Sequence, residues 1–198
     1  DAAVKAQILS QKIVGITGRM NSGKDTCFTL LSQRINCKRV ALADSLRREL
    51  NPFISDKFGI DLFNCERPEK DLVRPILVEY ARIKRRQTNG RYFIDKIDSY
   101  VRSLNCTVVI TDLRHAAYER DELYWLKNEL KGVLVHVSKY KEIDGKRVFS
   151  ESPIQDERDN DPKMRAAADY LIEWPEVDDV SELGPYADKL LAFLEELK

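Results

Sequence analysis

Residues 18–26 read GRMNSGKDT and combine two glycines, a lysine and three side chains with hydroxyl or carboxylate groups. The apolar run 12–17 precedes them, and an apolar stripe at helical spacing follows. A glycine-rich turn between a buried strand and a helix points several backbone N–H groups at one anion, and the helix N-terminus adds partial positive charge. Lys24 can reach β- and γ-phosphates. We therefore expect an ATP-binding loop made by Gly18, Arg19, Asn21, Ser22, Gly23, Lys24, Asp25 and Thr26.

Asp25 stands where such a loop usually carries the hydroxyl that binds magnesium. A carboxylate beside a triphosphate is repulsive unless a divalent cation lies between them. Because Mg²⁺ keeps several of its waters, a carboxylate that binds the ion through water is compatible with the loop. Thr26, one residue later, still offers a hydroxyl to phosphate or metal. The simpler interpretation is that Asp25 complements the helix dipole, and the two interpretations are compatible.

A second motif is TVVITDLRH, residues 107–115, in which four apolar residues lead to Asp112. The carboxyl end of a central strand is where open α/β sheets bind ligands, and a carboxylate there holds Mg²⁺ directly or through water. An acidic helix cap is the alternative. Arg114 would face the same side and is a candidate for stabilising charge on a transferred phosphoryl group. The expected catalytic residues are Lys24, Asp112 and Arg114, and the expected Mg²⁺ ligands, largely through water, are Asp25, Thr26 and Asp112.

Asp44 follows the apolar run 39–42. It can cap a helix that starts at Ser45, which alone would explain it. The functional alternative is an acceptor site in which Asp44 bonds a sugar or base and Arg47 holds a phosphate.

Residues 74–93 combine an apolar stripe with several arginines at helical spacing. Such a run is most often a solvated helix face, although guanidinium groups also make good bidentate clamps for phosphate. Because the run lies in a segment expected to face the phosphate loop, we place the acceptor phosphate near it. The expected acceptor-binding residues are Asp44, Arg47, Arg74 and Arg86.

Short β-branched runs alternate with amphipathic stretches, which predicts a parallel sheet wound by helices. The expected strands are 12–17, 39–42, 107–111, 133–137 and 169–173. Two segments break this rhythm. Residues 43–100 form a long, mostly helical insertion, and residues 139–163 are charged with little regular pattern, which predicts either a functional lid or a disordered loop. Arg147 and Arg158 are the lid residues most suited to reach phosphate. We expect one domain over residues 1–198.

The composition limits the class of partner. Lys plus Arg equals Asp plus Glu, at 33 each in 198 residues, so the basic excess typical of nucleic-acid-binding proteins is missing. Four widely separated cysteines lack zinc-site spacing and favour reduced thiols in a cytoplasmic protein. The sequence has no apolar run of the roughly 18 residues that a membrane span requires. Residues 1–12 have no secretory layout and are expected to form an arm or short helix. His115 and His136 show no partner pattern, and we interpret both as structural.

The order and spacing of GRMNSGKDT, ALADSLRREL, RPILVEYARIKRR, VVITDLRHAAYERDELYWL and VLVHV resemble the bacteriophage-type deoxynucleoside monophosphate kinases over roughly residues 12 to 195. In that family a Gly-Lys-Asp-Thr loop is the usual form. The resemblance implies a three-layer α/β fold of the nucleoside monophosphate kinase type, with a five-stranded parallel sheet in the order 2-3-1-4-5. It also implies ATP and Mg²⁺, residues 43–100 as the acceptor-binding insertion and residues 139–163 as the lid.

Departures from the family occur at Leu77-Val78, Tyr80-Ala81 and His115, and they bear on which base is accepted. Two other readings stay open. Dephospho-coenzyme A kinase and the animal-type phosphomevalonate kinases share the loop and the sheet but use another acceptor. A nucleotide-binding protein without turnover is the third reading, and the joint presence of Lys24 and Arg114 with Asp112 argues against it. The sequence does not distinguish a monomer from a homodimer, nor ribose from deoxyribose.

Overall fold

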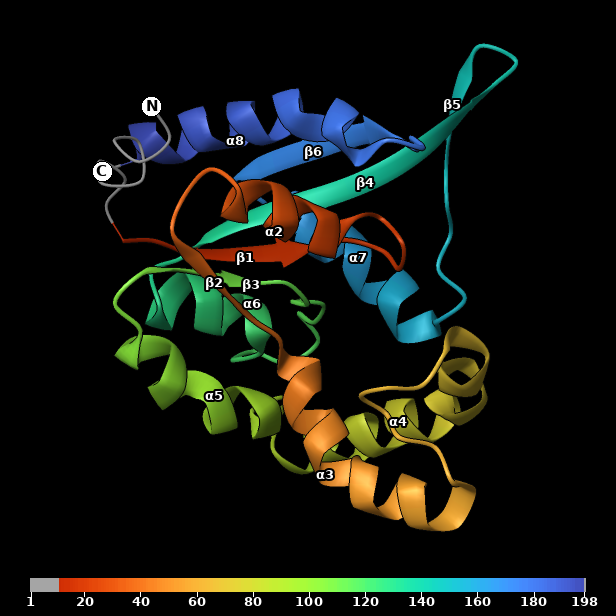
Figure 1. Cartoon of the computed structure of the whole chain (residues 1–198). Coiled ribbons are helices and arrows are strands. Elements are labelled where there is room, and N and C mark those ends of the chain that lie inside the picture. Colours follow the sequence, from red (N-terminus) through yellow and green to blue (C-terminus); the bar gives the residue numbers. More distant parts are fainter. Residues whose placement is uncertain (1–10, 198) are drawn as a thin grey trace.

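The computed structural model describes residues 11–197, so the arm expected at residues 1–12 lies almost wholly outside the described residues. Within them a six-stranded sheet forms the centre of the molecule (Figure 1). Its strands are β1 (Ile13–Thr17), β2 (Cys37–Val40), β3 (Thr107–Ile110), β4 (Val133–Ile143), β5 (Lys146–Phe149) and β6 (Tyr170–Pro175). The parallel part runs β2-β3-β1-β4-β6. This confirms the expected order 2-3-1-4-5, with β6 as the fifth predicted strand.

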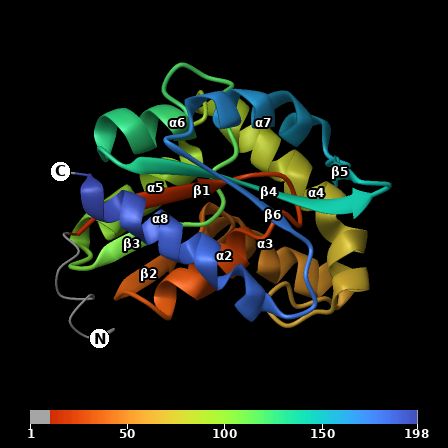
Figure 2. The ribbon, with the colours of Figure 1, turned by 90° about the horizontal axis from the view of Figure 1, so that it is seen from above.

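Helices cover both faces of the sheet, as the view from above shows (Figure 2). One face packs against α2 (Lys24–Ser32) and α8 (Gly184–Glu196), and a short 3₁₀ helix (Val180–Leu183) leads into α8. The other face packs against α5 (Tyr92–Ser103), α6 (Glu122–Tyr124) with its π-helical continuation (Trp125–Glu129), and α7 (Gln155–Ala167). Strand β3 shows why: Val109 joins the first core, whereas Val108 and Ile110 join the second, because successive side chains of a strand point to opposite faces.

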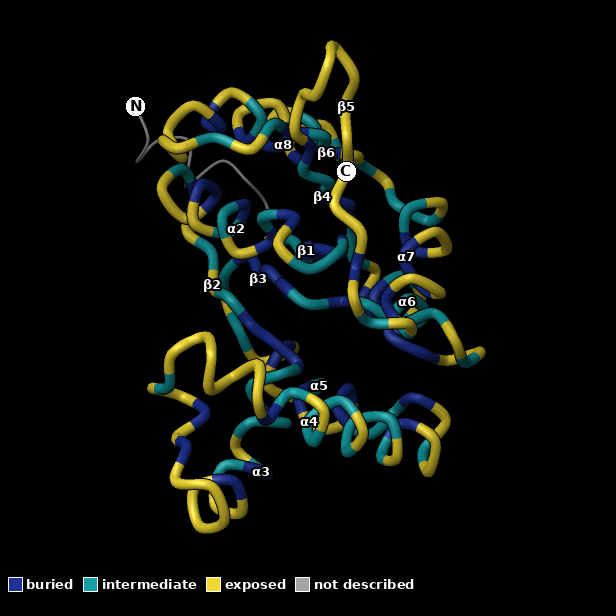
Figure 3. The backbone as a smooth tube through the Cα atoms, turned by 90° about the vertical axis from the view of Figure 1, so that its right-hand side faces the viewer, coloured by how far each residue is buried: buried dark blue, intermediate teal, exposed yellow. Residues whose placement is uncertain are grey.

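The expected helical insertion is present and consists of α3 (Leu42–Phe58), α4 (Arg67–Gln87) and the start of α5. Helices α3 and α4 enclose a small core of their own around Leu50, Ile54 and Val73. Figure 3 shows this lobe set apart from the sheet, with exposed residues along its outer side. The insertion therefore packs largely on itself, below the carboxyl ends of β2 and β3.

Residues 139–163 are more regular than expected. Strand β4 continues to Ile143 and pairs with β5 in an antiparallel hairpin that projects from the molecule (Figure 1). Asp144 and Gly145 form its turn, with φ values of 51° and 73°. Asp-Gly with two positive φ angles is a preferred hairpin turn, so the signal was present in the sequence. Helix α7 follows, and it was missed because it buries one large apolar side chain, Met164, among charged residues.

No helix within residues 11–197 is both long and apolar enough to cross a membrane.

Candidate phosphate-binding and catalytic site

The loop between β1 and α2 has the geometry of a phosphate cradle. Gly18 and Gly23 have φ values of 149° and 100°, and Asn21 has a φ of 62°. A Cβ on Gly18 would lie 2.3 Å from the carbonyl oxygen of Val137, and one on Gly23 would lie 2.8 Å from the Trp174 ring. Both positions therefore require glycine on conformational and steric grounds. The loop therefore lies at the carboxyl end of β1, against the middle of β4 and the end of β6.

Lys24 begins α2 and bends back over the loop. Its Nζ donates hydrogen bonds to the carbonyl oxygens of Gly18 at 2.8 Å and Arg19 at 2.9 Å. Burial, and to a smaller extent the nearby Arg114 guanidinium, lower the pKa of Lys24 to about 8. Three carboxylates, Glu157, Asp112 and Asp25, act on it in the opposite direction. The structure thus places Arg114 and Asp112 near enough to Lys24 to influence its pKa, and the catalytic roles expected for the three residues stay predictions.

Asp112 follows β3 and caps the N-terminus of α3, whose first residues lie 70 positions earlier in the chain. Its Oδ1 and Oδ2 accept hydrogen bonds from the backbone N–H groups of Leu42 and Ala43, each at 2.8 Å. The expected cap, Asp44 before a helix starting at Ser45, is therefore wrong, because α3 already begins at Leu42. A carboxylate has about four lone-pair positions, so both caps leave capacity on Asp112 for a metal-bound water.

Asp25 points away from the loop toward β2. Its side chain is 76% exposed and pairs with Arg39, Nε to Oδ1, at 3.1 Å. Arg39 also lies 3.6 Å from Asp44. Among residues 11–197 no three His, Cys, Asp or Glu side chains form a metal-binding group by themselves. The residues near Lys24 accordingly fit a magnesium ion held mainly by water and phosphate oxygens, with Asp112 and the Thr26 hydroxyl as the protein groups.

Arg114 is held by two acidic residues. Its backbone N–H donates to Glu122 Oε1 at 2.8 Å, and its Nη1 lies 3.5 Å from Glu157 Oε2. The Nε of Arg114 is buried and has no acceptor among the described residues. An unpaired guanidinium N–H beside Lys24 provides a donor for an incoming phosphate oxygen.

A buried ionic cluster lies behind Arg114 and was not predicted as such. Arg85 donates to both carboxylate oxygens of Asp121, at 2.7 and 2.6 Å, and to Glu122 at 2.9 Å. Burial raises the pKa of Glu122 to about 8, and neighbouring Asp121 adds to the rise against the opposing influence of Arg85. Burial lowers the pKa of adjacent His115 to about 3, so its ring is neutral at pH 7.

The expected acceptor residues are only partly brought together. Arg47 pairs with Asp44 at 2.9 Å on α3, at the carboxyl end of β2. Arg74 on α4 lies 3.7 Å from the sulfur of Met20, which joins the insertion to the phosphate loop. Arg86 is exposed and is adjacent to the buried Arg85, so the two side chains leave α4 in different directions.

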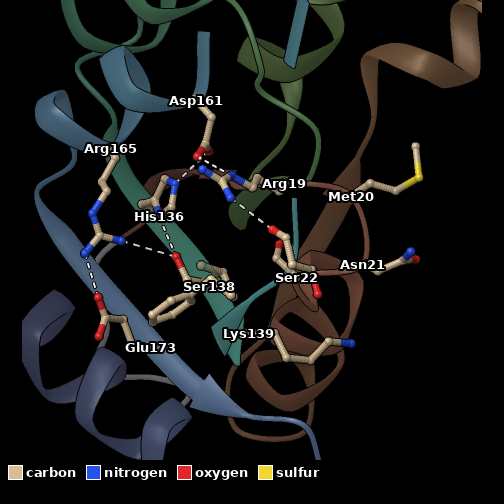
Figure 4. A pocket seen from close by; sticks show the side chains of 13 residues that line it. Arg19, Met20, Asn21, Ser22, His136, Ser138, Lys139, Asp161, Arg165 and Glu173 are labelled. Carbon is tan, nitrogen blue, oxygen red and sulfur yellow. Dashed lines mark hydrogen bonds and ion pairs between the residues drawn. The ribbon is translucent and has the colours of Figure 1, made fainter. Parts of the chain in front are cut away.

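Polar groups on β4 and α7 extend the site beyond the loop (Figure 4). His136 has a partner that no sequence pattern indicated: its Nε2 lies 2.8 Å from Asp161 Oδ1, and Asp161 also pairs with Arg19 at 3.1 Å. These residues line a cavity of about 230 Å³ between the loop, the hairpin and α7. His136 and Asp161 are 25 residues apart in sequence, and Arg19 and Asp161 are 142 apart, so no local pattern could have revealed these pairs.

The two expected lid arginines do not reach the loop in this structure. Arg147 lies 4.4 Å from the centre of the Tyr140 ring and 3.6 Å from Glu173. Arg158 donates to the carbonyl oxygen of Ser152 at 2.7 Å and is otherwise exposed.

Comparison with known proteins supports the fold. Neither the models of protein families nor the curated proteins give a match. Among solved structures, dephospho-CoA kinase from Campylobacter jejuni is similar over 94% of this chain and 98% of that chain, with 12% identity and a TM-score of 0.51. A shikimate kinase from Bacteroides thetaiotaomicron is similar over 94% and 99%, with 14% identity and a TM-score of 0.51. The chain therefore has the α/β fold of P-loop kinases. The finer resemblance to deoxynucleoside monophosphate kinases remains a prediction.

Proposed function

We propose that this protein transfers the γ-phosphoryl group of ATP to a (deoxy)nucleoside monophosphate and releases the diphosphate. The observation that carries the proposal is the convergence of Lys24, Asp112 and Arg114 on a phosphate cradle at the carboxyl edge of the sheet. Phosphoryl transfer requires little covalent chemistry from the protein. It requires two aligned substrates and positive charge around the group in transit, which these residues are suited to supply.

Each residue has a distinct role in this proposal. Lys24 exchanges its two carbonyl partners, Gly18 and Arg19, for β- and γ-phosphate oxygens. Arg114 donates its unpaired Nε to the transferring phosphoryl group, where the negative charge is spread over equatorial oxygens. Asp112 and Thr26 would hold a hydrated Mg²⁺, and the ion would supply positive charge that neutralises the phosphates.

The acceptor is assigned to the face between α3, α4 and the loop. Arg74 already touches the loop at Met20, and the Asp44–Arg47 pair presents a guanidinium and a carboxylate at the end of β2. A phosphate of the acceptor would bind the arginines, and a sugar hydroxyl would bind Asp44. Contacts with Arg86 require a rearrangement of α4, so its role is the least supported of the four.

A second candidate keeps the chemistry and changes the acceptor. The likeness to a dephospho-CoA kinase covers 94% of the chain, and the departures at residues 77–81 lie in α4 on the acceptor side. Dephospho-coenzyme A or phosphomevalonate would then replace the nucleotide acceptor. A binding protein without turnover would need neither the Arg114 donor nor the Asp112 carboxylate.

A panel assay tests these proposals. ADP release from MgATP is measured with no acceptor, with each common ribo- and deoxyribonucleoside monophosphate, and with dephospho-coenzyme A and phosphomevalonate. The proposal expects stimulation by one or more nucleoside monophosphates. Stimulation by only a non-nucleotide acceptor would transfer the assignment to the second candidate. Tight ATP binding without any acceptor-dependent release would favour a binding protein.

A further inference from the structure

The first turn of α7, residues 155–158, presents two carboxylates to arginines in different parts of the site. Glu157 is 95% buried, with a relative exposure of 5%. Its Oε1 accepts a hydrogen bond from the backbone N–H of Met20 at 2.6 Å, and its Oε2 lies 3.5 Å from Arg114 Nη1. That Oε2 has no hydrogen-bond donor among the described residues. A buried carboxylate oxygen without a donor is costly, so this position calls for a functional explanation.

Asp156 makes the matching contact on the acceptor side. Its Oδ2 lies 3.3 Å from both Nε and Nη2 of Arg82 on α4. Figure 1 shows the start of α7 directly above the α4 region, with the phosphate loop alongside. The first turn of α7 therefore joins the loop, Arg114 and the acceptor-binding insertion through side-chain carboxylates.

The remainder of α7 is anchored independently of this turn. Met164 is fully buried in the core of the sheet, and Asp161 pairs with His136 and Arg19. Asn160 accepts a hydrogen bond from the backbone N–H of Ala116 at 3.0 Å. Among residues 11–197, the side chains of its two acids supply the contacts by which the first turn meets the loop, Arg114 and Arg82.

Charge makes these contacts incompatible with bound phosphates. Glu157 accepts the backbone N–H of Met20 in the phosphate loop at 2.6 Å and lies 3.5 Å from Arg114, so its carboxylate occupies two groups that a bound phosphate would also use. Like charges at contact distance repel strongly in a partly dehydrated site. Arg114 has one N–H facing Glu157 and another, Nε, with no acceptor. A phosphate oxygen at Arg114 would satisfy the free N–H and displace the carboxylate.

We propose that the acidic first turn of α7 is an internal substitute for substrate phosphates: Glu157 holds Arg114 and the loop, Asp156 holds Arg82, and the substrates displace both. The inference rests on the proposed function and extends it. It adds Arg82 as a phosphate ligand on the acceptor side, where the sequence had favoured Arg86. Release of this turn is then coupled to occupation of both phosphate positions.

Binding of two probes in the presence of Mg²⁺ tests the proposal by calorimetry. Inorganic tripolyphosphate represents the donor phosphates, and diadenosine pentaphosphate spans the donor and acceptor positions. Glu157→Gln should tighten both probes by about tenfold, the equivalent of about 1.4 kcal/mol. Asp156→Asn should tighten only the pentaphosphate, by about threefold, because its pair with Arg82 is partly exposed. Asp159→Asn is the matched control, since it removes one charge from the exposed side of the same helix, where Asp159 contacts Gln155.

The outcomes separate this inference from the proposed function. If the wild-type protein binds the probes and Glu157→Gln binds them with equal or lower affinity, the inference is overturned and the proposed function is not affected. An equal gain of affinity in Asp159→Asn would show that the effect comes from net charge, and this result would also overturn the inference. Failure of the wild-type protein to bind either probe would remove the proposed function as well. Arg82→Met gives an independent readout if a carboxylate variant is unstable: it should weaken the pentaphosphate and leave tripolyphosphate unchanged, and an unchanged pentaphosphate affinity would contradict the role of Arg82.

Discussion

Replacement of Arg85 by methionine should destabilise the protein far more than the same change at its neighbour Arg86. The side chains of Arg85, Asp121 and Glu122 are 8%, 1% and 5% exposed, and three hydrogen bonds of 2.6–2.9 Å join them. Methionine fills much of the volume but leaves two carboxylates buried without their cation. Arg86 is exposed on the same turn of α4 and is the matched control.

The expected magnitude follows from the burial. Removing one partner of a buried ion pair typically costs about 3–5 kcal/mol. For a chain of this length each kcal/mol lowers the melting temperature by about 2–4 °C, so Arg85→Met should lower it by roughly 6–20 °C. Arg86→Met should change stability by no more than about 0.5 kcal/mol, as is usual for exposed sites.

Thermal and denaturant unfolding at several pH values supplies the assay. Without Arg85, the folded-state pKa of Glu122, which burial already raises to about 8, rises further, because the guanidinium that opposes the rise is gone. Groups with a raised folded-state pKa stabilise at low pH and lose that contribution as the pH rises. Below about pH 8 Glu122 is protonated in both folded proteins, so the gap between Arg85→Met and wild type should change little there and should widen as the pH rises above about 8. A loss equal to that of Arg86→Met, or a gap that narrows with rising pH, would refute the reasoning.

Three further predictions concern the site itself. Lys24→Ala should lower turnover by roughly 10²–10³-fold, the usual loss for one electrostatic donor, and turnover within a few-fold of wild type would contradict its role. Affinity for ATP should decline as the pH rises above about 8, because the ligand-free pKa of Lys24 is about 8 and phosphate binding raises it; calorimetry showing flat affinity up to pH 10 would count against this. Arg114→Ala should chiefly lower kcat, by about 10³-fold, whereas Arg47→Ala should chiefly raise KM for the monophosphate, and steady-state kinetics with the reverse pattern would show that donor and acceptor sides are exchanged.

The central part of the fold could be predicted from the sequence because its signals are local. The run 12–17, the glycine-rich loop and the stripe after it specify a strand, a turn and a helix within about twenty residues, and the structure contains all three. Asp112 was placed correctly at the end of β3 by the apolar residues before it. Its role as the cap of α3 was not assigned, since the capped amides lie about 70 residues earlier.

What sequence reasoning missed depends on contacts between distant segments. Arg85 and Arg86 are the same residue type, but the side chains of adjacent helix positions differ by about 100° in direction. The carboxylates that select Arg85 lie 36 and 37 residues later in the chain. Helix α7 was missed because its inward face is largely polar, with Glu157, Asn160 and Asp161 bonded to other elements instead of an apolar stripe. Hydrophobic periodicity cannot reveal such a helix.

Transfer of label from γ-labelled ATP tests the central claim most directly. The protein is incubated with Mg²⁺, labelled ATP and the nucleoside monophosphates, and the products are separated by chromatography. The account predicts label in a nucleoside diphosphate at a level that requires the monophosphate and falls with Lys24→Ala. Label that remains in ATP, or that appears only as inorganic phosphate whatever monophosphate is present, would contradict it.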